Sequence, residues 1–160
     1  MTSHEGRCEV TRADPFGAES LLLAAKLWTE LGSIYGLSQL DSFTPEQISG
    51  PGTAFVLARL NGRAVGCGAI VPLRAAGPQI AELKRMFVVK ESRRFGIAAA
   101  ILAALETEAC AAGYEALWLE TGLKQPAAIA LYEGAGYRGI ARYGRYRDDP
   151  LSVCYEKRLT

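Results

Sequence analysis

Histidine and paired cysteines are nearly absent from this sequence. Its one histidine, His4, lies close to the start, and its four cysteines are widely spaced, with no CxxC pair. Zinc sites and Ser-His or Cys-His nucleophiles draw on these residue types, so the sequence argues against a metal centre and against such a nucleophile. We expect Cys8, Cys67, Cys110 and Cys154 to be free thiols in a reducing cytoplasm.

A strong charge imbalance and a long apolar run are also missing. The formal net charge is +1, which gives no electrostatic basis for binding nucleic acid or an anionic membrane surface. The most apolar stretch, residues 96–105, is too short to span a bilayer, and residues 1–7 lack the apolar core of a secretory signal. The prediction is a cytoplasmic protein without nucleic-acid or membrane partners, and a homodimer is compatible with the sequence.

No internal repeat, low-complexity tract or charged linker divides the chain. The 160 residues, 49% of them apolar, are enough to bury the core of one domain. We therefore expect a single domain over residues 1–160, with residues 1 to about 7 as a flexible terminus. Neither a GxxxxGK[ST] loop nor a GxGxxG fingerprint is present, which counts against a general nucleotide-binding module.

The first third of the chain predicts one strand and then helix. Residues 8–13 alternate weakly as a strand does, and apolar positions recur at helical spacing from Leu21 onward. Gly32 and Gly36 interrupt this spacing, so we expect a second short helix or a loop to begin there. A polar loop follows, with one helical turn expected at residues 45–48.

The rest of the chain alternates between short strands and helices. The dipeptide Asn61-Gly62 predicts a β-hairpin, because both residues tolerate positive φ. The predicted strands cover residues 54–60, 64–71, 80–89, 116–121, 137–141 and 152–158, and the predicted helices cover residues 97–112 and 126–134. The resulting order, β-α-α-β-β-β-α-β-α-β-β, indicates an α/β fold with a mixed, mostly antiparallel sheet of about seven strands flanked by helices.

The segment Arg93-Arg94-Phe95-Gly96-Ile97-Ala98 is the most informative part of the sequence. It joins a predicted strand to a long Ala/Leu helix. A glycine turn that opens a helix directs several backbone N–H groups at one point, and the helix dipole adds partial positive charge there. The turn is therefore suited to a phosphate or pyrophosphate, and its arginines supply further positive charge.

This segment resembles a known motif. Arg93-x-x-Gly96-x-Ala98 is similar to the Arg/Gln-x-x-Gly-x-Gly/Ala acetyl-CoA motif of the GCN5-related N-acetyltransferases, the GNAT superfamily. Three neighbouring features agree in order and spacing: Met86-Phe87-Val88 before the turn, the helical segment that ends at Tyr132, and the turn Gly136-Tyr137. The resemblance covers the second half of the chain strongly, and the first half only in its pattern of strands and helices.

The resemblance implies acetyl-CoA as co-substrate and no metal. In many GNAT members the strand before the motif splays away from the next strand and leaves backbone amides free for the pantetheine arm and the acetyl carbonyl. Ala98 stands where glycine is commoner, and Gln125 stands where an asparagine often contacts CoA. The residues expected to bind acetyl-CoA are Met86, Phe87, Val88, Arg93, Arg94, Phe95, Gly96, Ile97, Ala98 and Gln125.

Acetyl transfer to an amine needs a proton acceptor for the amine, a hydrogen-bond donor for the developing oxyanion and an acid for the leaving thiolate. Glu82 lies eleven residues before Arg93, a spacing similar to that of the catalytic glutamate in the histone-acetyltransferase branch, and it is the first candidate for the base. Its alternative role is an ion pair with Lys84, Arg85 or a more distant arginine. Glu120 is the second candidate, as a base or as a counter-ion for the substrate's ammonium group.

Tyr132 occupies the position of the family's tyrosine near the CoA sulfur and is the candidate acid. The pKa of a phenol is close to that of a departing thiol, so proton donation is chemically reasonable. The alternative is an aromatic side chain that only packs in the core.

The acceptor site of the family is built from the first two helices and from the loop between the last two strands. Here these segments contribute Glu30, Tyr35, Asp41, Phe43, Tyr143, Arg145, Tyr146 and Arg147, of which Glu30, Tyr35, Tyr143 and Arg145 are the main candidates for substrate binding. The predicted function is acetyl-CoA-dependent N-acetyl transfer, directly to a primary amine of a small molecule. The alternatives are a non-catalytic acyl-CoA-binding regulatory domain and a protein or peptide amino-group acetyltransferase.

Overall fold

The computed structural model describes residues 6–36 and 42–159. His4, Asp41 and most of the expected flexible start lie outside these ranges. The strands are β1 (Cys8–Arg12), β2 (Ala54–Leu60), β3 (Arg63–Pro72), β4 (Ile80–Val88), β5 (Ala116–Gly122), β6 (Arg138–Ile140) and β7 (Ser152–Arg158). The α-helices are α1 (Ala18–Tyr35), α2 (Ile97–Ala111) and α3 (Pro126–Gly134), and short 3₁₀ turns include η2 (Pro45–Ile48), η4 (Lys90–Ser92) and η5 (Gly144–Tyr146).

The strands form one mixed sheet in the order β1-β2-β3-β4-β5-β7-β6. Every neighbouring pair is antiparallel except β4 and β5, which run parallel. A parallel pair needs a crossover connection, and α2 supplies it. This arrangement confirms the predicted α/β fold with a seven-stranded, mostly antiparallel sheet.

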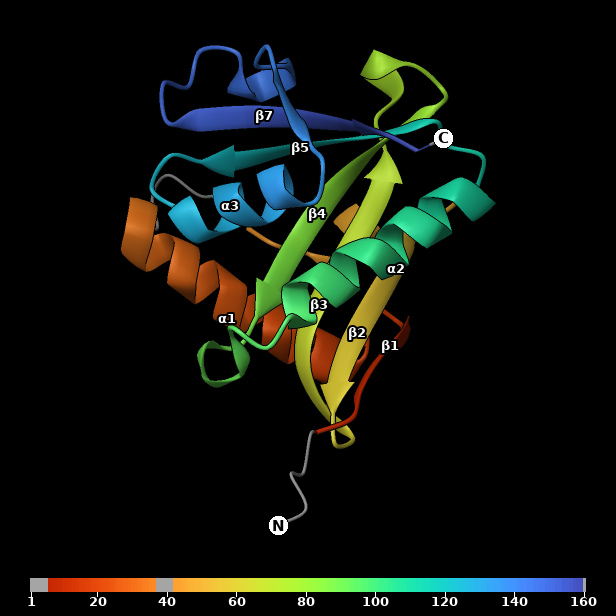
Figure 1. Cartoon of the computed structure of the whole chain (residues 1–160), viewed down its shortest axis with the longest axis vertical. Coiled ribbons are helices and arrows are strands. Elements are labelled where there is room, and N and C mark those ends of the chain that lie inside the picture. The colour runs from red at the N-terminus through yellow and green to blue at the C-terminus, as the bar shows by residue number, and fades with distance from the viewer. Residues whose placement is uncertain (1–5, 37–41, 160) are drawn as a thin grey trace.

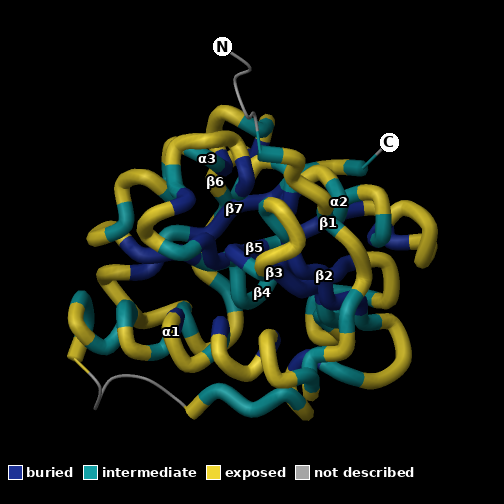
Figure 2. Tube along the Cα trace, turned by 90° about the horizontal axis from the view of Figure 1, so that it is seen from below, coloured by how far each residue is buried: buried dark blue, intermediate teal, exposed yellow. Residues whose placement is uncertain are grey.

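Helices cover both faces of the sheet. In Figure 1, α2 and α3 lie in front of it and α1 lies behind it. Two separate groups of buried side chains match this layering: one includes Leu102, Leu105 and Leu117 with α2, and the other includes Leu23 and Leu27 of α1. Figure 2 shows the strands as the buried centre between these layers. The apolar area removed from water on both faces is what holds the helices to the sheet.

The hairpin between β2 and β3 forms as predicted. Asn61 and Gly62 have φ angles of 54° and 81°, so both take up the left-handed conformation that a two-residue hairpin turn requires. This turn sets the register of the two strands, in which Leu60 lies opposite Arg63.

The first helix differs from the prediction. It continues through Gly32 to Tyr35 and ends at Gly36, whose backbone N–H donates to the Gly32 carbonyl and whose φ is 89°. A helical glycine costs about 1 kcal/mol relative to alanine, and burial of Leu23 and Leu27 on the same helix offsets that cost. The second helical element is instead the 3₁₀ turn η2, at the residues 45–48 where one helical turn was predicted.

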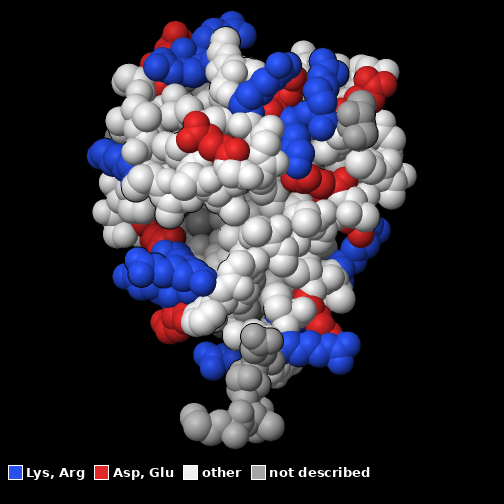
Figure 3. Space-filling model, viewed as in Figure 1, with Lys and Arg blue, Asp and Glu red and all other residues white. Residues whose placement is uncertain are grey.

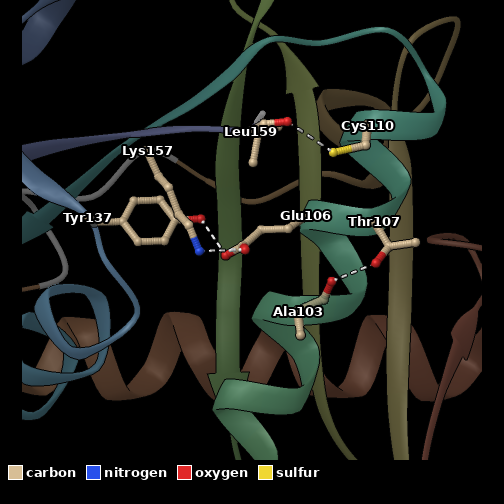
Figure 4. Close-up of polar contacts among 7 residues, drawn as sticks. All are labelled: Ala103, Glu106, Thr107, Cys110, Tyr137, Lys157 and Leu159. Atoms are coloured by element: carbon tan, nitrogen blue, oxygen red, sulfur yellow. Dashed lines mark hydrogen bonds and ion pairs between the residues drawn. The ribbon is translucent and has the colours of Figure 1, made fainter.

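A half-buried polar contact ties α2 to the end of the sheet. Glu106 of α2 accepts hydrogen bonds from the Tyr137 hydroxyl at 3.1 Å and from Lys157 Nζ at 2.8 Å (Figure 4). Tyr137 follows α3 and Lys157 lies on β7, so one carboxylate joins three segments that are distant in the sequence. Hydrogen bonds to a charged partner are about twice as strong as neutral ones, which gives this contact a clear structural role.

Candidate active site

The sheet opens between β4 and β5. The two strands pair only from Ile80 with Ala116 to Glu82 with Trp118. Beyond Glu82, β4 continues to Val88, while β5 stays paired with β7 along its whole length. Figure 1 shows β4 turning away from β5 and β7, with α3 beside the opening. The last six residues of β4 therefore have no backbone partner on this side, as the family resemblance implied.

A β-bulge lies in the same part of β4. Cys67 of β3 pairs with Phe87, but Ala69 pairs with Lys84, so two residues of β4 oppose Gly68 alone. Arg85 has a φ of 62°, in the left-handed region. The bulge also exchanges the two faces of the strand: Leu83 is buried on the α2 side, whereas Phe87, four residues later, is buried on the α1 side.

A cavity of about 860 Å³ occupies the opening between the strands, and we call it the transfer cavity. In Figure 3 a hollow is visible in this face of the molecule, with Lys and Arg side chains along one border. Its walls come from α1, η2, β4, the end of β5, α3 and η5. The polar residues that line it include Tyr35, Lys84, Arg85, Glu120, Gln125, Tyr132, Arg145 and Asp149.

The turn before α2 has the backbone of an anion site. Arg94 and Gly96 have φ angles of 72° and 77°, and Gly96 is the N-cap residue of α2. Intrahelical bonding begins with Ala100 N–H, which donates to the Gly96 carbonyl at 3.1 Å, so the preceding helical N–H groups have no partner within the helix. No side chain caps them, and no acidic residue lies in the first turn. The side chain of Phe95 is 74% exposed.

Arg93, the first residue of the motif, faces the protein. Its Nη2 donates to Glu30 Oε1 at 2.6 Å, and its Nε donates to the Val88 carbonyl at 2.8 Å. The guanidinium also lies 5.7 Å from the centre of the Phe87 ring. Two predicted groups, one for the cofactor and one for the substrate, are thus brought together as an ion pair that fastens α1 to the end of β4.

Glu82 is buried, 5% exposed, and both its carboxylate oxygens are occupied. The Tyr143 hydroxyl donates to Oε2 at 2.5 Å, and Lys84 Nζ lies 3.0 Å from Oε1. Burial would lower the pKa of Lys84, but the charge of Glu82 and the contact with Tyr146 outweigh it and raise that pKa. Neither Glu82 nor Tyr143 belongs to the residues that line the transfer cavity. Arg85 does not contact Glu82: it lies in the β4 bulge, and its side chain contacts Thr44 and Gln47 instead.

Glu120 lines the transfer cavity from β5. Burial raises the pKa of its carboxyl; the hydrogen bond from Ser152 acts in the opposite direction, and the charge of Asp149 raises it further. The Ser152 hydroxyl donates to Glu120 Oε2 at 2.7 Å. The second oxygen has no hydrogen-bond partner among the residues that the structure describes. A carboxylate with a raised pKa and one free oxygen in a cavity is equipped to take up a proton.

Tyr132 is 6% exposed and lines the same cavity from α3. Its ring packs edge-on against Tyr137, with the ring centres 5.7 Å apart. Burial and, to a smaller extent, the charge of Glu120 raise the pKa of its hydroxyl, so this group keeps its proton at neutral pH. Within residues 6–36 and 42–159 the hydroxyl makes no hydrogen bond. It is therefore available to donate to a bound group.

The remaining predicted residues divide between the cavity and its borders. Tyr35 donates a hydrogen bond of 3.3 Å to Gln125 Oε1, and a side chain at Gly122 would collide with the Tyr35 hydroxyl. Tyr35, Gly122 and Gln125 all line the transfer cavity. Arg145 lines it from η5, beside the Tyr146 ring at 5.3 Å. Met86 lines it from β4, whereas Phe87 and Val88 are buried in the two core groups.

Two residues at this site were not predicted for these roles. Ser152, the hydrogen-bond donor to Glu120, is the first residue of β7 and carries no motif in the sequence. Arg85 was considered only as a partner for Glu82, yet it lies on the cavity wall. Strand alternation predicts Lys84 beside Glu82, but it would turn Arg85 to the side of Leu83, so the sequence carried no signal for the position that the bulge gives Arg85.

Among the described residues, no group of His, Cys, Asp and Glu side chains is arranged to hold a metal ion. None of the helices in the same ranges combines the length and apolarity that crossing a membrane requires.

The chain is similar to known acetyltransferases. The family model for the acetyltransferase (GNAT) family matches residues 22–137. A curated relative, named IAA acetyltransferase, from Azospirillum brasilense is 37% identical over 150 residues, which are 94% of this chain and 97% of the relative.

Solved structures are similar over nearly the whole chain. A protein from Klebsiella pneumoniae subsp. pneumoniae, described as an acyl-CoA N-acyltransferase, is 36% identical, with a TM-score of 0.77, over 96% of this chain and 98% of that one. An acetyltransferase from Salmonella typhimurium, solved with its cofactor acetyl-CoA, is 14% identical, with a TM-score of 0.68, over 96% of this chain and 94% of that one. The latter likeness shows the shared fold.

Proposed function

This chain belongs to the acetyltransferase (GNAT) family, and we propose that it transfers an acetyl group from acetyl-CoA directly to a primary amine of a small molecule. The observation that carries the proposal is the transfer cavity, which joins the unpaired part of β4 to Glu120 and Tyr132. A neighbour of the same fold was solved with acetyl-CoA, and a relative is named an acetyltransferase; both support the reaction.

The binding of acetyl-CoA is proposed at two backbone sites. The uncapped N-terminus of α2, from Arg94 to Ala98, is suited to the pyrophosphate, because its free N–H groups and helix dipole favour an anion. The unpaired edge of β4 at residues 86–88 is suited to the pantetheine arm, since its backbone groups on that side lack a strand partner. Arg93 supports both sites by holding the turn to α1 and to Val88.

We propose Glu120 as the proton acceptor and place Glu82 in a supporting role. Glu120 lines the cavity, and one of its oxygens has no hydrogen-bond partner in the described part of the chain, whereas Glu82 is held by Tyr143 and Lys84 outside the lining. The acceptor enters as an ammonium group, and Glu120 takes one proton from it, directly or through water. The neutral nitrogen then attacks the thioester carbon, so that a C–N bond forms and the C–S bond breaks, and the nitrogen loses its second proton to solvent.

Tyr132 is proposed to protonate the departing CoA thiolate. Its hydroxyl is protonated at neutral pH and has no other partner in the described part of the chain. A free thiol has a lower pKa than this phenol, so the proton transfer is helped by the return of the proton that Glu120 has taken, through the cavity or solvent. The amide product and CoA then leave, and both side chains have returned to their resting protonation states.

The direct test is release of CoA thiol by purified protein with acetyl-CoA and a panel of acceptors: amino acids, a polyamine, an aminoglycoside, a lysine peptide and IAA. Thiol release that depends on a small amine supports the proposal. Acetyl-CoA binding without release for any acceptor would favour the non-catalytic alternative. Release with the lysine peptide alone would favour a protein amino-group acetyltransferase.

A further inference from the structure

A second cavity lies between α1 and the sheet, and the proposed transfer does not use it. Its volume is about 310 Å³, and we call it the apolar chamber. Its walls are mostly apolar and include the large side chains of Trp28, Phe43 and Phe55. Ser42, Phe43, Ile48 and Arg85 line both this chamber and the transfer cavity, so the two spaces meet at these residues.

Arg85 lies at this junction, and its hydrogen-bond and ring partners among the described residues are all neutral. Its Nη2 donates to Gln47 Oε1 at 2.6 Å and to the Thr44 carbonyl at 3.3 Å, and the guanidinium lies 4.1 Å from the centre of the Phe43 ring. No carboxylate of the described chain forms an ion pair with it. Arg85 differs in this from Arg12, Arg59 and Arg93, each of which has a glutamate partner.

The backbone bulge and specific hydrogen bonds hold Arg85 in this position. The residue lies in the β4 bulge with a φ of 62°, a conformation that is unfavourable for a long side chain. Its Gln47 contact belongs to the capping box of η2, in which Gln47 Oε1 also accepts the Thr44 N–H at 3.1 Å. Burial lowers the pKa of Arg85, while the neighbouring Cys67 acts in the opposite direction. Its Nη1 and Nε groups make no hydrogen bond within the described residues, and they remain available to a ligand.

The charges of the two spaces are complementary to a zwitterion. The transfer cavity is lined by Lys84, which is paired with Glu82, by Arg145, and by Glu120 and Asp149, whose carboxylates suit an ammonium group. Arg85 lies on the opposite strand of the opening, next to the apolar chamber. A guanidinium with free donors binds a carboxylate in a planar, two-point geometry. The chamber offers an apolar group a place out of water.

Resting on the acetyl transfer proposed above, we propose that Arg85 binds a carboxylate of the acceptor and that the apolar chamber holds its apolar side chain. The acceptor is then a small amine that carries both groups, as an apolar or aromatic α-amino acid does. The carboxylate is bound without any covalent change, and the amino group is the one presented to the transfer cavity.

Calorimetry on the full chain saturated with CoA tests this assignment through binding alone. The three probes are phenylalanine, phenethylamine, which lacks the carboxylate, and alanine, which lacks the ring. We expect phenylalanine to bind at least about tenfold more tightly than either of the others. Equal affinities for phenylalanine and phenethylamine, or no measurable binding of phenylalanine, would overturn the proposal.

Variants of Arg85 locate the contact. Arg85→Gln is expected to weaken phenylalanine binding at least about tenfold and to leave phenethylamine unchanged, because only the carboxylate contact is lost. The phenylalanine affinity of Arg85→Lys should lie between those of the unmodified chain and Arg85→Gln, since lysine keeps the charge but lacks the planar guanidinium. Arg63→Gln, at an exposed arginine of the β2–β3 hairpin, is the matched control and should change neither affinity. Equal weakening of both probes by Arg85→Gln would contradict the proposal.

Two further measurements separate this inference from the proposed function. The acetyl-CoA affinity and the melting temperature of Arg85→Gln show whether this variant is folded. If it is not, the three probe affinities of the unmodified chain and the affinities of Arg85→Lys still test the carboxylate site. Thiol release with a small amine, together with phenylalanine binding that Arg85→Gln and Arg85→Lys leave unchanged, would support acetyl transfer and reject the carboxylate site. Tight phenylalanine binding without thiol release would support the site and reject the transfer.

Discussion

The hydroxyl of Tyr143 donates a hydrogen bond of 2.5 Å to Glu82 Oε2, across 61 residues of sequence. Burial and the charge of Glu82 raise the pKa of Tyr143, so the hydroxyl remains a donor. Lys84 contacts the other carboxylate oxygen, so both oxygens of Glu82 have a partner at the last residue pair between β4 and β5. Glu82 thus holds the loop after β6 over the point at which the sheet opens.

Glu82→Gln is expected to destabilise the fold. The substitution keeps the shape but leaves Lys84, whose side chain is 28% exposed, without its anion. Breaking a buried pair costs roughly 3–5 kcal/mol, and we expect about 3 kcal/mol or less because Lys84 is not fully buried. Urea unfolding measures the change.

The reciprocal variants provide the control. Lys84→Gln and the double variant Glu82→Gln/Lys84→Gln complete a cycle, and the double variant should be more stable than the sum of the two single losses predicts. A Glu82→Gln protein of normal stability, with activity lost mainly at low pH, would return the role of base to Glu82.

Glu120→Gln should lower turnover at neutral pH by about 10²–10⁴-fold, the usual effect of losing a positioned base. The stability of the fold, unlike turnover, should stay the same or rise in this variant at neutral pH. Because burial raises the pKa of Glu120 in the folded state, its stabilising contribution is present below the unfolded pKa and is lost as pH rises through the folded pKa. The Gln variant is therefore expected to melt at the same or a higher temperature than the unmodified chain at neutral pH.

Glu115→Gln, at an exposed position just before β5, is the matched control for this charge change and should leave turnover unchanged. Comparison of melting curves and pH–rate profiles at several pH values provides the measurement. A Glu120→Gln protein with the profile of the unmodified chain would exclude Glu120 as the base.

Gly96→Asp is expected to reduce acetyl-CoA affinity at least about tenfold, or about 1.4 kcal/mol. It puts a negative charge on the N-cap of α2, where the free N–H groups attract an anion. Gly113→Asp is a close control at the other end of the same helix: its φ of 87° resembles the 77° of Gly96, and neither glycine has a heavy atom within 4 Å of an added Cβ. Calorimetry that shows equal affinities for the two variants would reject the proposed phosphate site.

Tyr132→Phe should lower turnover by about 10²–10⁴-fold while acetyl-CoA binding and stability change little. The ring keeps its packing, and the lost hydroxyl has no hydrogen bond within the described residues. Its neighbour Tyr137 provides the contrast, because the Tyr137 hydroxyl contacts Glu106 (Figure 4) and not the cavity. Tyr137→Phe should cost about 1.5–3 kcal/mol of stability and leave turnover unchanged. Turnover that is normal in Tyr132→Phe would assign Tyr132 to the core.

Local sequence patterns were sufficient where short-range physics decides the structure. The Asn61-Gly62 hairpin and the glycine turn at Gly96 both depend on residues that accept positive φ, and both form where they were predicted. The strand at residues 152–158 agrees residue for residue, since its ends follow from local alternation and turn residues. The interruption predicted at Gly32 was wrong, because the free-energy cost of a glycine within a helix is small and the packing of α1 outweighs it.

The tertiary structure alone decided which candidate carboxylate is free. In the sequence, Glu82 and Glu120 are both acids on neighbouring strands, and nothing local distinguishes them. The distinction comes from Tyr143 and Ser152, which reach these strands from segments 61 and 32 residues away. Arg85 is a similar case, because the bulge that sets its direction appears only when β3 pairs with β4. The order of the elements and the glycine turn before α2 have causes that lie within a few residues, so both could be predicted; long-range pairing determines which side chains share the cavity.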